Sequence, residues 1–525
     1  MELVKRNLHQ MCRKSEAVSQ VTFDEDFNVP DAKPDVGRMI QKKGDVQIAD
    51  VQVSEGKARV FGGLTFHLLY VADDEGRRVY SLGGELPIDE TIHLDGLTGG
   101  DKICLKWDLE DLTIHKINSR KLNIRSVVTF YTSIEELKDI PVPVEIRDGE
   151  GVSMKKKEIR ALELGVQKKD TLRVKETVTL ASNKPNIHEI LWKDMEVRGL
   201  ELRPEENQIS AKGELFLFCL YAGDDGEQPL QWVEQAIPFS GQVECSGCTA
   251  DMIPNIESTM IQANVEIQPD ADGEERMLQA DAVLELDMKL YQEETLSLLQ
   301  DVYTPKMDCV PVNQEEILES LLIRNYSKCR VSDKIGISAP QNRVLQICHS
   351  DGKVRLDEVK VVEDGIKVQG IVELRILYIV SDDDMPFYAA EAAIPFTHVI
   401  EAEGIHKECR YYLRTDLEQL SATMLDSNEI EVKAVINLNA IVLDLQKEEV
   451  MQEVEERPLD REKLQNMPGI VCYMVQSGDT LWDIAKRFYT TTDAIRALNE
   501  LKSDELRPMP VSYTHLRAHE TAANL

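Results

Sequence analysis

A repeated strand pattern decides the fold of this chain, and its first copy reads Gly62-Gly63-Leu64-Thr65-Phe66-His67-Leu68-Leu69-Tyr70. The spacing of 8 residues from Gly to Tyr recurs from 213 to 221 and from 370 to 378. A proline follows each tyrosine after 17 residues, at Pro87, Pro238 and Pro395. The period is therefore 151 and then 157 residues, which is the length of a domain and not of a solenoid repeat. We interpret the pattern as three tandem copies of one domain.

Every second residue of the pattern is apolar or aromatic, as expected for a strand with one buried face. The three sets are Leu64, Phe66, Leu68 and Tyr70; Leu215, Leu217, Cys219 and Tyr221; and Val372, Leu374, Ile376 and Tyr378. The opposite face varies freely between copies: Thr65 becomes Phe216 and Glu373, and His67 becomes Phe218 and Arg375. We therefore expect His67 to be a surface or inter-domain histidine and not a repeated functional group.

An acidic stretch follows each tyrosine. The three stretches are Asp73-Asp74-Glu75-Gly76, Asp224-Asp225-Gly226 and Asp382-Asp383-Asp384. Clustered carboxylates could hold calcium, but no EF-hand spacing is present, and the same residues are ordinary in hairpin turns. We favour turns. The strand after each turn is expected to end at Leu86-Pro87, Ile237-Pro238 or Ile394-Pro395, because proline suits a strand end or a sheet edge.

The fold class follows from further strand patterns at Leu122–Phe130, Ala282–Leu286 and Ile430–Val435. Upstream, Lys33-Pro34-Asp35 recurs as Lys184-Pro185-Asn186. The sequence predicts a mainly β protein with sandwich-like domains at 1–135, 171–300 and 327–446 and short helical connections, although alternation alone does not separate a sandwich from a barrel. Residues Asn313–Ile323 are expected to form an amphipathic helix. The charged segments 135–170 and 447–470 are expected to be linkers, the second a flexible tether.

The composition excludes several partner classes. The net charge of −34 disfavours binding to nucleic acid or anionic membranes, because phosphates would be repelled. No run of 18 apolar residues is present, so we expect no transmembrane helix. The first residues, Met1-Glu2-Leu3-Val4-Lys5-Arg6, do not resemble a secretory signal. We therefore expect the protein to remain in the cytoplasm of the cell that makes it.

Ten scattered cysteines agree with a reducing compartment. Only Cys245 and Cys248 form a Cys-x-x-Cys pair. The pair could be half a zinc site or a redox pair, but a second pair at zinc spacing is absent. We favour a loop role for this pair, and we expect no cofactor and no metal site.

The segment Tyr473–Asn499 has the most specific local pattern in the chain. Tyr473 and Val475 alternate with polar residues, as in a short half-buried strand. Gly478 permits a turn, and Thr480 is placed to cap a helix. The apolar face of that helix carries Leu481, Ile484, Ala485 and Phe488. Thr492 is expected to cap a second helix that carries Ile495 and Leu498 and ends at Asn499 in a left-handed conformation. These residues resemble the LysM family of small binding modules, which implies a strand–helix–helix–strand fold over residues 471–510.

The expected closing strand departs from the LysM pattern. After Leu506-Arg507-Pro508 the chain continues Met509-Pro510-Val511-Ser512-Tyr513-Thr514-His515-Leu516-Arg517. This run resembles a translated adapter sequence, with a divergent natural tail as the alternative. We therefore expect residues 511–525 to be foreign and the module to lack its closing strand.

The whole chain resembles the clostridial spore-coat morphogenesis family. The resemblance rests on three tandem β domains, the opening Met1–Arg6, the stretch Asp24-Glu25-Asp26-Phe27-Asn28-Val29-Pro30-Asp31 and the C-terminal LysM pattern. The repeats of that family are called SPOCS domains. The resemblance implies a protein made in the mother cell that helps to encase the forespore surface, with its LysM module bound to a coat morphogenetic ATPase.

Three classes of function remain. The first is a non-catalytic coat-assembly adaptor, whose repeats act as a scaffold and whose LysM module docks to the ATPase. The second is a binder of peptidoglycan or a chitin-like glycan in the cell wall or spore cortex. LysM resemblance implies that either ligand contacts Gly478, Asp479, Thr480, Leu481, Trp482, Ile495 and Asn499, with hydrophobic packing as the alternative role of Trp482. The third is an enzyme, which we disfavour because no catalytic motif is present in the sequence.

Overall fold

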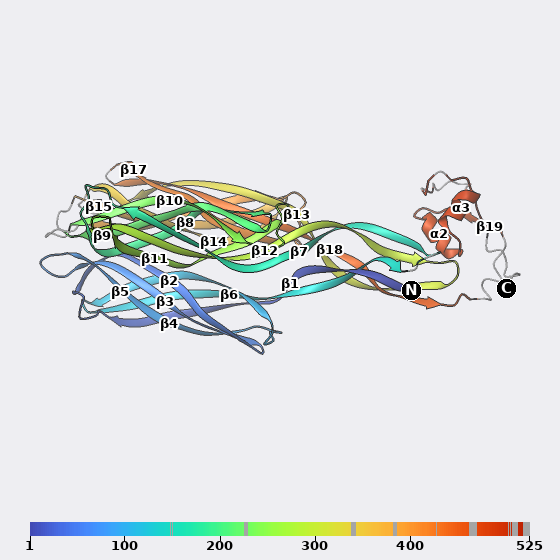
Figure 1. Ribbon diagram of the computed structural model, residues 1–525, viewed down its shortest axis with the longest axis horizontal. Coiled ribbons are helices and arrows are strands. Elements are labelled where there is room, and N and C mark those ends of the chain that lie inside the picture. The colour runs from blue at the N-terminus through green and yellow to red at the C-terminus, as the bar shows by residue number, and fades with distance from the viewer. Residues whose placement is uncertain are drawn as a thin grey trace.

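The chain forms three β units followed by a small module with two helices (Figure 1). The computed structural model describes residues 1–147, 149, 151–224, 229–337, 343–381, 386–426, 428–460, 470–501, 503, 504, 506 and 513–517. The first unit contains β1 (Glu2–Asn28), β2 (Val36–Ser54), β3 (Lys57–Ala72), β4 (Val79–His93), β5 (Lys102–Asn118) and β6 (Lys121–Arg147).

The second and third units repeat this order. The second contains β7 (Ser153–Thr179), β8 (Ile187–Glu205), β9 (Gln208–Gly223), β10 (Leu230–Glu244), β11 (Ile253–Pro269) and β12 (Glu275–Tyr303). The third contains β13 (Asp308–Gly336), β14 (Val344–Val362), β15 (Gly365–Val380), β16 (Phe387–Glu401), β17 (Arg410–Met424) and β18 (Glu429–Arg457). The module contains β19 (Ile470–Met474), α2 (Leu481–Arg487), α3 (Thr492–Leu498) and β20 (Tyr513–Arg517).

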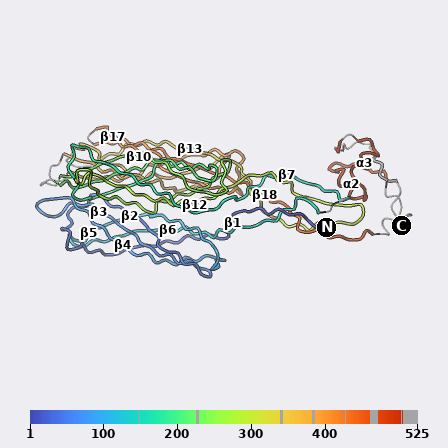
Figure 2. The backbone as a smooth tube through the Cα atoms, in the orientation of Figure 1, coloured from blue at the N-terminus to red at the C-terminus, as the bar shows by residue number. Residues whose placement is uncertain are grey.

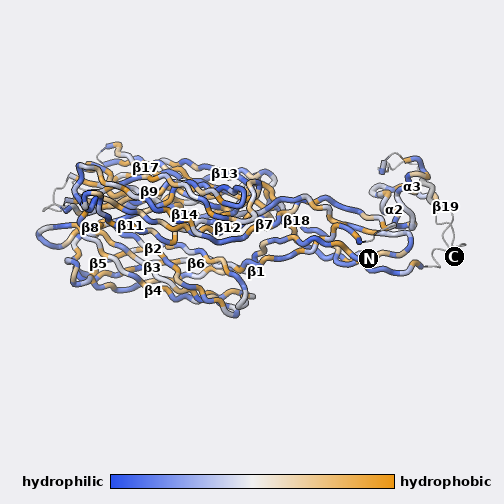
Figure 3. Tube along the Cα trace, in the orientation of Figure 1, coloured by the Kyte–Doolittle hydropathy of each residue, from blue (hydrophilic) through white to orange (hydrophobic). Residues whose placement is uncertain are grey.

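Each unit is a sandwich of two three-stranded antiparallel sheets, which confirms the predicted fold class. The sheet orders are β2-β3-β4 with β1-β6-β5, β10-β9-β8 with β11-β12-β7, and β14-β15-β16 with β13-β18-β17. In the first unit, Phe66 and Tyr70 of β3 share one core with Phe130 of β6. Hydrophobic and hydrophilic residues alternate along the strands (Figure 3). None of the twelve repeated apolar residues is more than 4% exposed, so the predicted core face is confirmed.

The repeated tyrosine also anchors the connection between the two sheets. The hydroxyl of Tyr70 donates to the carbonyl of Pro34 (3.0 Å), and that of Tyr221 donates to the carbonyl of Pro185 (3.4 Å). Burial raises the pKa of both tyrosines to about 12. The Lys-Pro recurrence in the sequence is therefore the backbone partner of the repeated tyrosine.

Two details of the sheets differ from the sequence prediction. Pro87 lies inside β4, which continues to His93, so the strand does not end at the proline. The edge alternative is confirmed, because β4 is an outer strand of its sheet and needs no hydrogen bond from Pro87. The first acidic stretch forms the β3–β4 turn, where Asp74 Oδ1 accepts from the Arg77 amide (2.8 Å). Residues 225–228 and 382–385, which carry most of the other two stretches, lie outside the described residues.

The three units pack around a common axis, on the sheet faces opposite to their own cores. Leu69, Leu220 and Leu377 occupy equivalent positions, are at most 1% exposed and meet in one hydrophobic cluster. At the same axis Lys43 forms an ion pair with Asp194 of the second unit. The variable face of the strand is thus an inter-unit interface.

Sequence variation on that face reflects different roles of equivalent positions. Phe218 is fully buried and stacks on His349 of the third unit (ring centroids 4.0 Å apart). Its equivalent Arg375 binds Asp351 (Nε–Oδ2 3.0 Å) and donates to a first-unit backbone carbonyl. Their equivalent His67 lines a cavity between the first two units, which confirms the inter-domain alternative. The face varies between copies because its equivalent positions make different contacts with the other units.

The long first and last strands of the units extend beyond the sandwiches and form a stalk (Figure 2). We define the stalk as residues 2–13 with 135–147, 153–164 with 291–303, and 308–321 with 443–457. Leu8, Leu298 and Leu318 from the three strand pairs share one core. Ion pairs whose carboxylates are largely buried link the strand pairs: Arg6–Glu163 (3.0 Å), Lys138–Glu316 (2.6 Å) and Lys157–Glu448 (2.6 Å). All three units therefore contribute to one stalk.

The stalk is formed by segments that the sequence predicted to be a helix and linkers. The expected helix Asn313–Ile323 lies within β13, and the expected linker 135–170 is mostly β6 and β7. The expected tether 447–470 begins within β18, which continues to Arg457. These predictions were wrong because the charged side chains that indicated solvent exposure are paired between strands of the stalk. Residues 461–469 of the tether lie outside the described residues.

The C-terminal module is closed by a second strand. β19 pairs antiparallel with β20, with Tyr473 opposite Thr514. The expectation of a module without its closing strand is therefore wrong, because residues 513–517 supply backbone partners for β19. That residues 511–525 are foreign to the protein stays a prediction. Among the residues that the structure describes, no helix is both long enough and apolar enough to cross a membrane.

Candidate binding site on the C-terminal module

The turn before α2 is held by side-chain hydrogen bonds. Gly478 has a φ of +99°, which favours glycine, and it is exposed. Asp479 Oδ2 accepts from the Tyr473 hydroxyl (2.9 Å) and from the Gln476 amide (2.7 Å). Thr480 is the N-cap of α2, as predicted, and its Oγ1 accepts from the Asp483 amide (3.1 Å). These contacts fix the shape of the exposed turn.

The second helix differs in both of its predicted ends. Its N-cap is Thr491 and not Thr492, because Thr491 Oγ1 accepts from the Ala494 amide (3.1 Å). Asn499 is the C-cap but has a φ of −106°, and its side-chain amide donates to the Ile495 carbonyl (2.9 Å). The left-handed residue is Glu500, with a φ of +51°. The predicted termination signal was therefore one residue early.

The predicted binding residues divide into two groups. Leu481 and Ile495 are 2% and 1% exposed and belong to the core of the module. Gly478 and Thr480 are exposed, while Asp479 and Asn499 are half-buried. The structure brings Leu481 and Ile495 together, and it leaves the polar turn accessible. Ligand contact by any of these residues stays a prediction.

The seventh residue, Trp482, contacts the end of the stalk. Its ring packs edge-on against Tyr303 of β12 (centroids 4.7 Å apart), and its Nε1 donates to Asp301 Oδ2 (2.8 Å). Lys486, one turn later, pairs with the other oxygen of Asp301 (2.7 Å). These contacts favour the packing role for Trp482 over ligand binding. Trp482 packs against the stalk.

Tyr303 fills the face of the module between its two helices. It is 3% exposed and lies in the same cluster as Leu481, Ile484, Ala485 and Ile495. Burial raises its pKa. The equivalent ends of the other two strand pairs carry Arg147 and Arg457, which are exposed. A comparison of the three strand ends would have singled out Tyr303 as the aromatic exception, but the sequence analysis missed it and Asp301.

The family comparisons agree with this organisation. The family model described as SipL, SPOCS domain matches residues 35–117, 186–268 and 343–425, and the LysM domain model matches residues 473–508. The chain therefore carries three SPOCS domains and one LysM domain. The three SPOCS matches cover β2–β5, β8–β11 and β14–β17, so most of the long stalk strands lies outside them. SPOCS and LysM are binding or adaptor domains and not catalytic domains. No curated protein and no solved structure matches the chain.

The cysteine pair has a structural explanation within the second SPOCS unit. Cys245 and Cys248 are fully buried free thiols in the β10–β11 connection. The equivalent positions carry Leu94 and Leu97 in the first unit and Ala402 and Ile405 in the third, and all are at most 8% exposed. Cys248 donates its backbone amide to the Cys245 carbonyl (3.1 Å), and the other units repeat this hydrogen bond. The pair therefore fills the positions of apolar anchors, as the loop interpretation requires.

Proposed function

We propose that this protein is a non-catalytic scaffold in spore-coat assembly that docks through its LysM module to a coat morphogenetic ATPase. Its place of action is the mother-cell cytoplasm at the forespore surface. One observation carries the scaffold role: three SPOCS units share a central core and a stalk, and the LysM module is held at the tip of that stalk by Tyr303. Such a body presents one docking head at a fixed distance from a broad surface.

The deciding experiment removes the LysM module without disturbing the stalk. A chain ending at Asp460 keeps all of β18, which ends at Arg457. We expect fluorescent fusions of this variant to lose localisation at the forespore and purified protein to lose binding to the ATPase. The control is the full chain with Leu137→Ala, because Leu137 is 50% exposed on the stalk. Unchanged localisation and unchanged ATPase binding of the shortened chain would contradict the proposal.

The second candidate function is binding of peptidoglycan. It is favoured by the LysM match and by the exposed turn at Gly478–Thr480. LysM-dependent co-sedimentation with isolated peptidoglycan would support it. Protein that stays in the supernatant, with and without the module, while it still binds the ATPase would leave only the adaptor role.

A further inference from the structure

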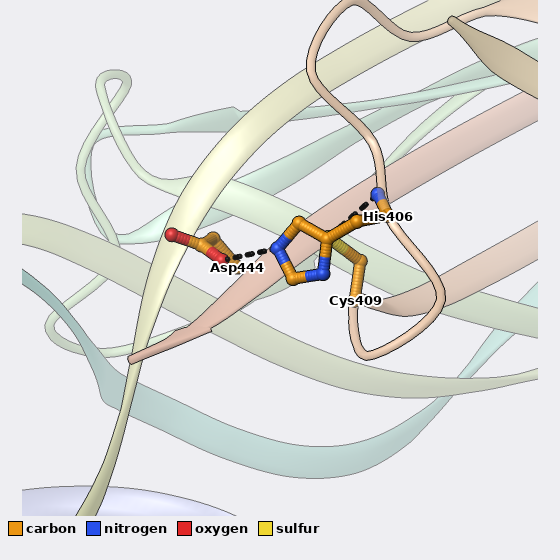
Figure 4. Close-up of side chains that lie close together, drawn as sticks. All are labelled: His406, Cys409 and Asp444. Carbon is orange, nitrogen blue, oxygen red and sulfur yellow. Dashed lines mark hydrogen bonds and ion pairs between the residues drawn. The ribbon is translucent and has the colours of Figure 1, made fainter. Parts of the chain in front are cut away.

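A group of side chains that could ligate a metal ion lies where the third unit joins the stalk, away from the LysM module. His406 and Cys409 belong to the β16–β17 connection, and Asp444 lies in β18 (Figure 4). His406 Nε2 is 3.0 Å from Asp444 Oδ1. One ligand atom from each residue lies within 4.8 Å of the others. An imidazole, a thiol and a carboxylate therefore converge from two chain segments.

The connection that carries His406 and Cys409 is held in place by the fold. Its backbone turns at Gly404 (φ +79°), and the buried Ala402 and Ile405 anchor it to the core of the unit. The Cys409 amide donates to the His406 carbonyl (3.0 Å), and Cys409 Sγ accepts from the His406 amide (3.5 Å). The Asp444 carboxylate is oriented by Gln446, whose Nε2 donates to Oδ2 (3.0 Å). The oxygen that faces His406 is thereby fixed.

The other two units have the same loop backbone with different side chains. The amide-to-carbonyl hydrogen bond of Cys409 recurs from Asp101 to Thr98 (3.1 Å) and from Met252 to Thr249 (3.3 Å). Neither loop places an imidazole and a thiol together. Cys409 is also a core residue of its unit, as its equivalent Met252 is of the second unit. The fold of the loop does not require the half-exposed His406 beside this thiol, and its presence needs a separate explanation.

We propose that His406, Cys409 and Asp444 bind one zinc ion, with a water molecule as the fourth ligand, although the sequence alone predicted no metal site. Zinc takes imidazole, thiolate and carboxylate ligands at about 2.0–2.3 Å, so tetrahedral ligand atoms lie about 3.3–3.7 Å apart. The three ligand atoms lie within 4.8 Å of one another, so binding has to draw them together, and His406 is the member whose exposed side chain has room to move. Binding displaces the proton of the Cys409 thiol to solvent. The bound ion links the β16–β17 connection to the residues of β18 where the stalk begins.

Cobalt(II) is the probe of choice, because a cobalt–thiolate bond gives a near-ultraviolet charge-transfer band. We expect the reduced full chain to bind one equivalent of cobalt with such a band and zinc to displace it. His406→Ala and Cys409→Ser are expected to abolish the band. Gln446→Ala is expected to weaken binding about 10-fold to 100-fold, as loss of a residue that orients a ligand does.

The controls separate this site from the other thiols. His406→Ala keeps all ten cysteines, so a band that survives in this variant would overturn the proposal. Cys472→Ser removes the exposed thiol and is expected to keep the band. His188→Ala removes an exposed histidine beside Asp224 that belongs to no group of three ligand-type side chains in the described part of the chain, and it is also expected to have no effect. Absence of any band in reduced, folded wild-type protein would equally overturn the proposal.

Discussion

At the scale of single residues, the buried His349 couples the stability of the protein to pH. It is 2% exposed, and its Nδ1 lies 2.9 Å from Glu234 Oε2 and its Nε2 3.5 Å from Asp194 Oδ2. Burial alone lowers the pKa of His349, but the carboxylates of Asp194 and Glu234, with a further contribution from Asp351, raise it to about 9. The nearby cation Lys43 is itself paired with Asp194.

The sign of the resulting pH dependence follows from this raised pKa. Protonated His349 stabilises the folded state fully below its ordinary pKa of 6.5, and the stabilisation is lost as pH rises through about 9. We expect His349→Gln to lower the free energy of unfolding by about 3 kcal/mol at pH 6, because it breaks a buried charge pair. The loss is expected to be much smaller at pH 10. Urea unfolding of both proteins at the two pH values measures it.

The control for this prediction is His188→Gln. His188 is an exposed histidine near Asp224, so its replacement is expected to change the free energy of unfolding by less than about 0.5 kcal/mol at either pH. An equal effect of His349→Gln at pH 6 and pH 10 would show that the residue contributes only by packing on Phe218.

At the scale of elements, Tyr303 at the end of β12 is expected to decide whether the LysM module stays on the stalk. Tyr303→Arg gives the second strand pair the residue type found at the ends of the other two, Arg147 and Arg457. An arginine there removes the aromatic contact with Trp482 and places a charge against apolar side chains. We expect faster amide hydrogen exchange throughout α2 and higher affinity for any ligand that uses Trp482.

Arg147→Tyr is the matched control for this change. Arg147 ends the corresponding strand of the first unit, and no contact between that strand end and the module is found among the described residues. Its exchange in α2 is expected to equal that of the wild type. If Tyr303→Arg also leaves exchange in α2 unchanged, the module is held by Asp301 and Lys486 and not by the tyrosine.

A second element-scale prediction concerns the core of the stalk. Leu298 is 1% exposed and shares a core with Leu8 and Leu318, whereas Leu137 on the same stalk is 50% exposed. Leu298→Ala leaves a cavity and is expected to lower the free energy of unfolding by about 2–5 kcal/mol. Leu137→Ala is expected to cost less than about 0.5 kcal/mol. Guanidinium denaturation of the two variants compares them, and equal costs would mean that the stalk is not a packed structure.

The elements also show what the sequence could and could not predict. Alternation over Leu64–Tyr70 was sufficient for the strand and its core face, because each sandwich buries that face within itself. The prediction of a helix at Asn313–Ile323 was wrong, because the acidic residues of this segment indicated a solvated helix face. Glu316 is only 7% exposed, since Lys138 from another unit pairs with it. A partner more than a hundred residues away leaves no local signal in the sequence.

The same limit applies to the candidate binding site. The caps and apolar positions of α2 followed from local spacing, since an N-cap and a helix face involve residues within a few positions of each other. The contact of Trp482 with Asp301 and Tyr303 depends on how the module sits on the stalk. The sequence therefore left two roles open for Trp482, ligand binding and packing.

At the scale of the whole molecule, the three units are expected to fold as one body and not as independent domains. Each unit contributes a strand pair to the stalk and one of the leucines Leu69, Leu220 and Leu377 to the axis. A unit alone would expose both apolar surfaces to water, and burial of such surfaces is the main source of stability. A chain divided between Arg147 and Ser153 should therefore reassemble.

This expectation can be tested by co-expression of residues 1–150 with residues 151–525. We expect the two fragments to purify as a 1:1 complex, because the first unit keeps both its axis face and its strand pair. Leu69→Asp is expected to abolish the complex, since it places an unpaired charge in the axis cluster. Leu137→Asp, which adds the same charge at an exposed position, is expected to leave the complex intact. Two fragments that each fold alone and remain apart would instead mean that the units are separate domains, and the stalk would then be no stable platform for the LysM module.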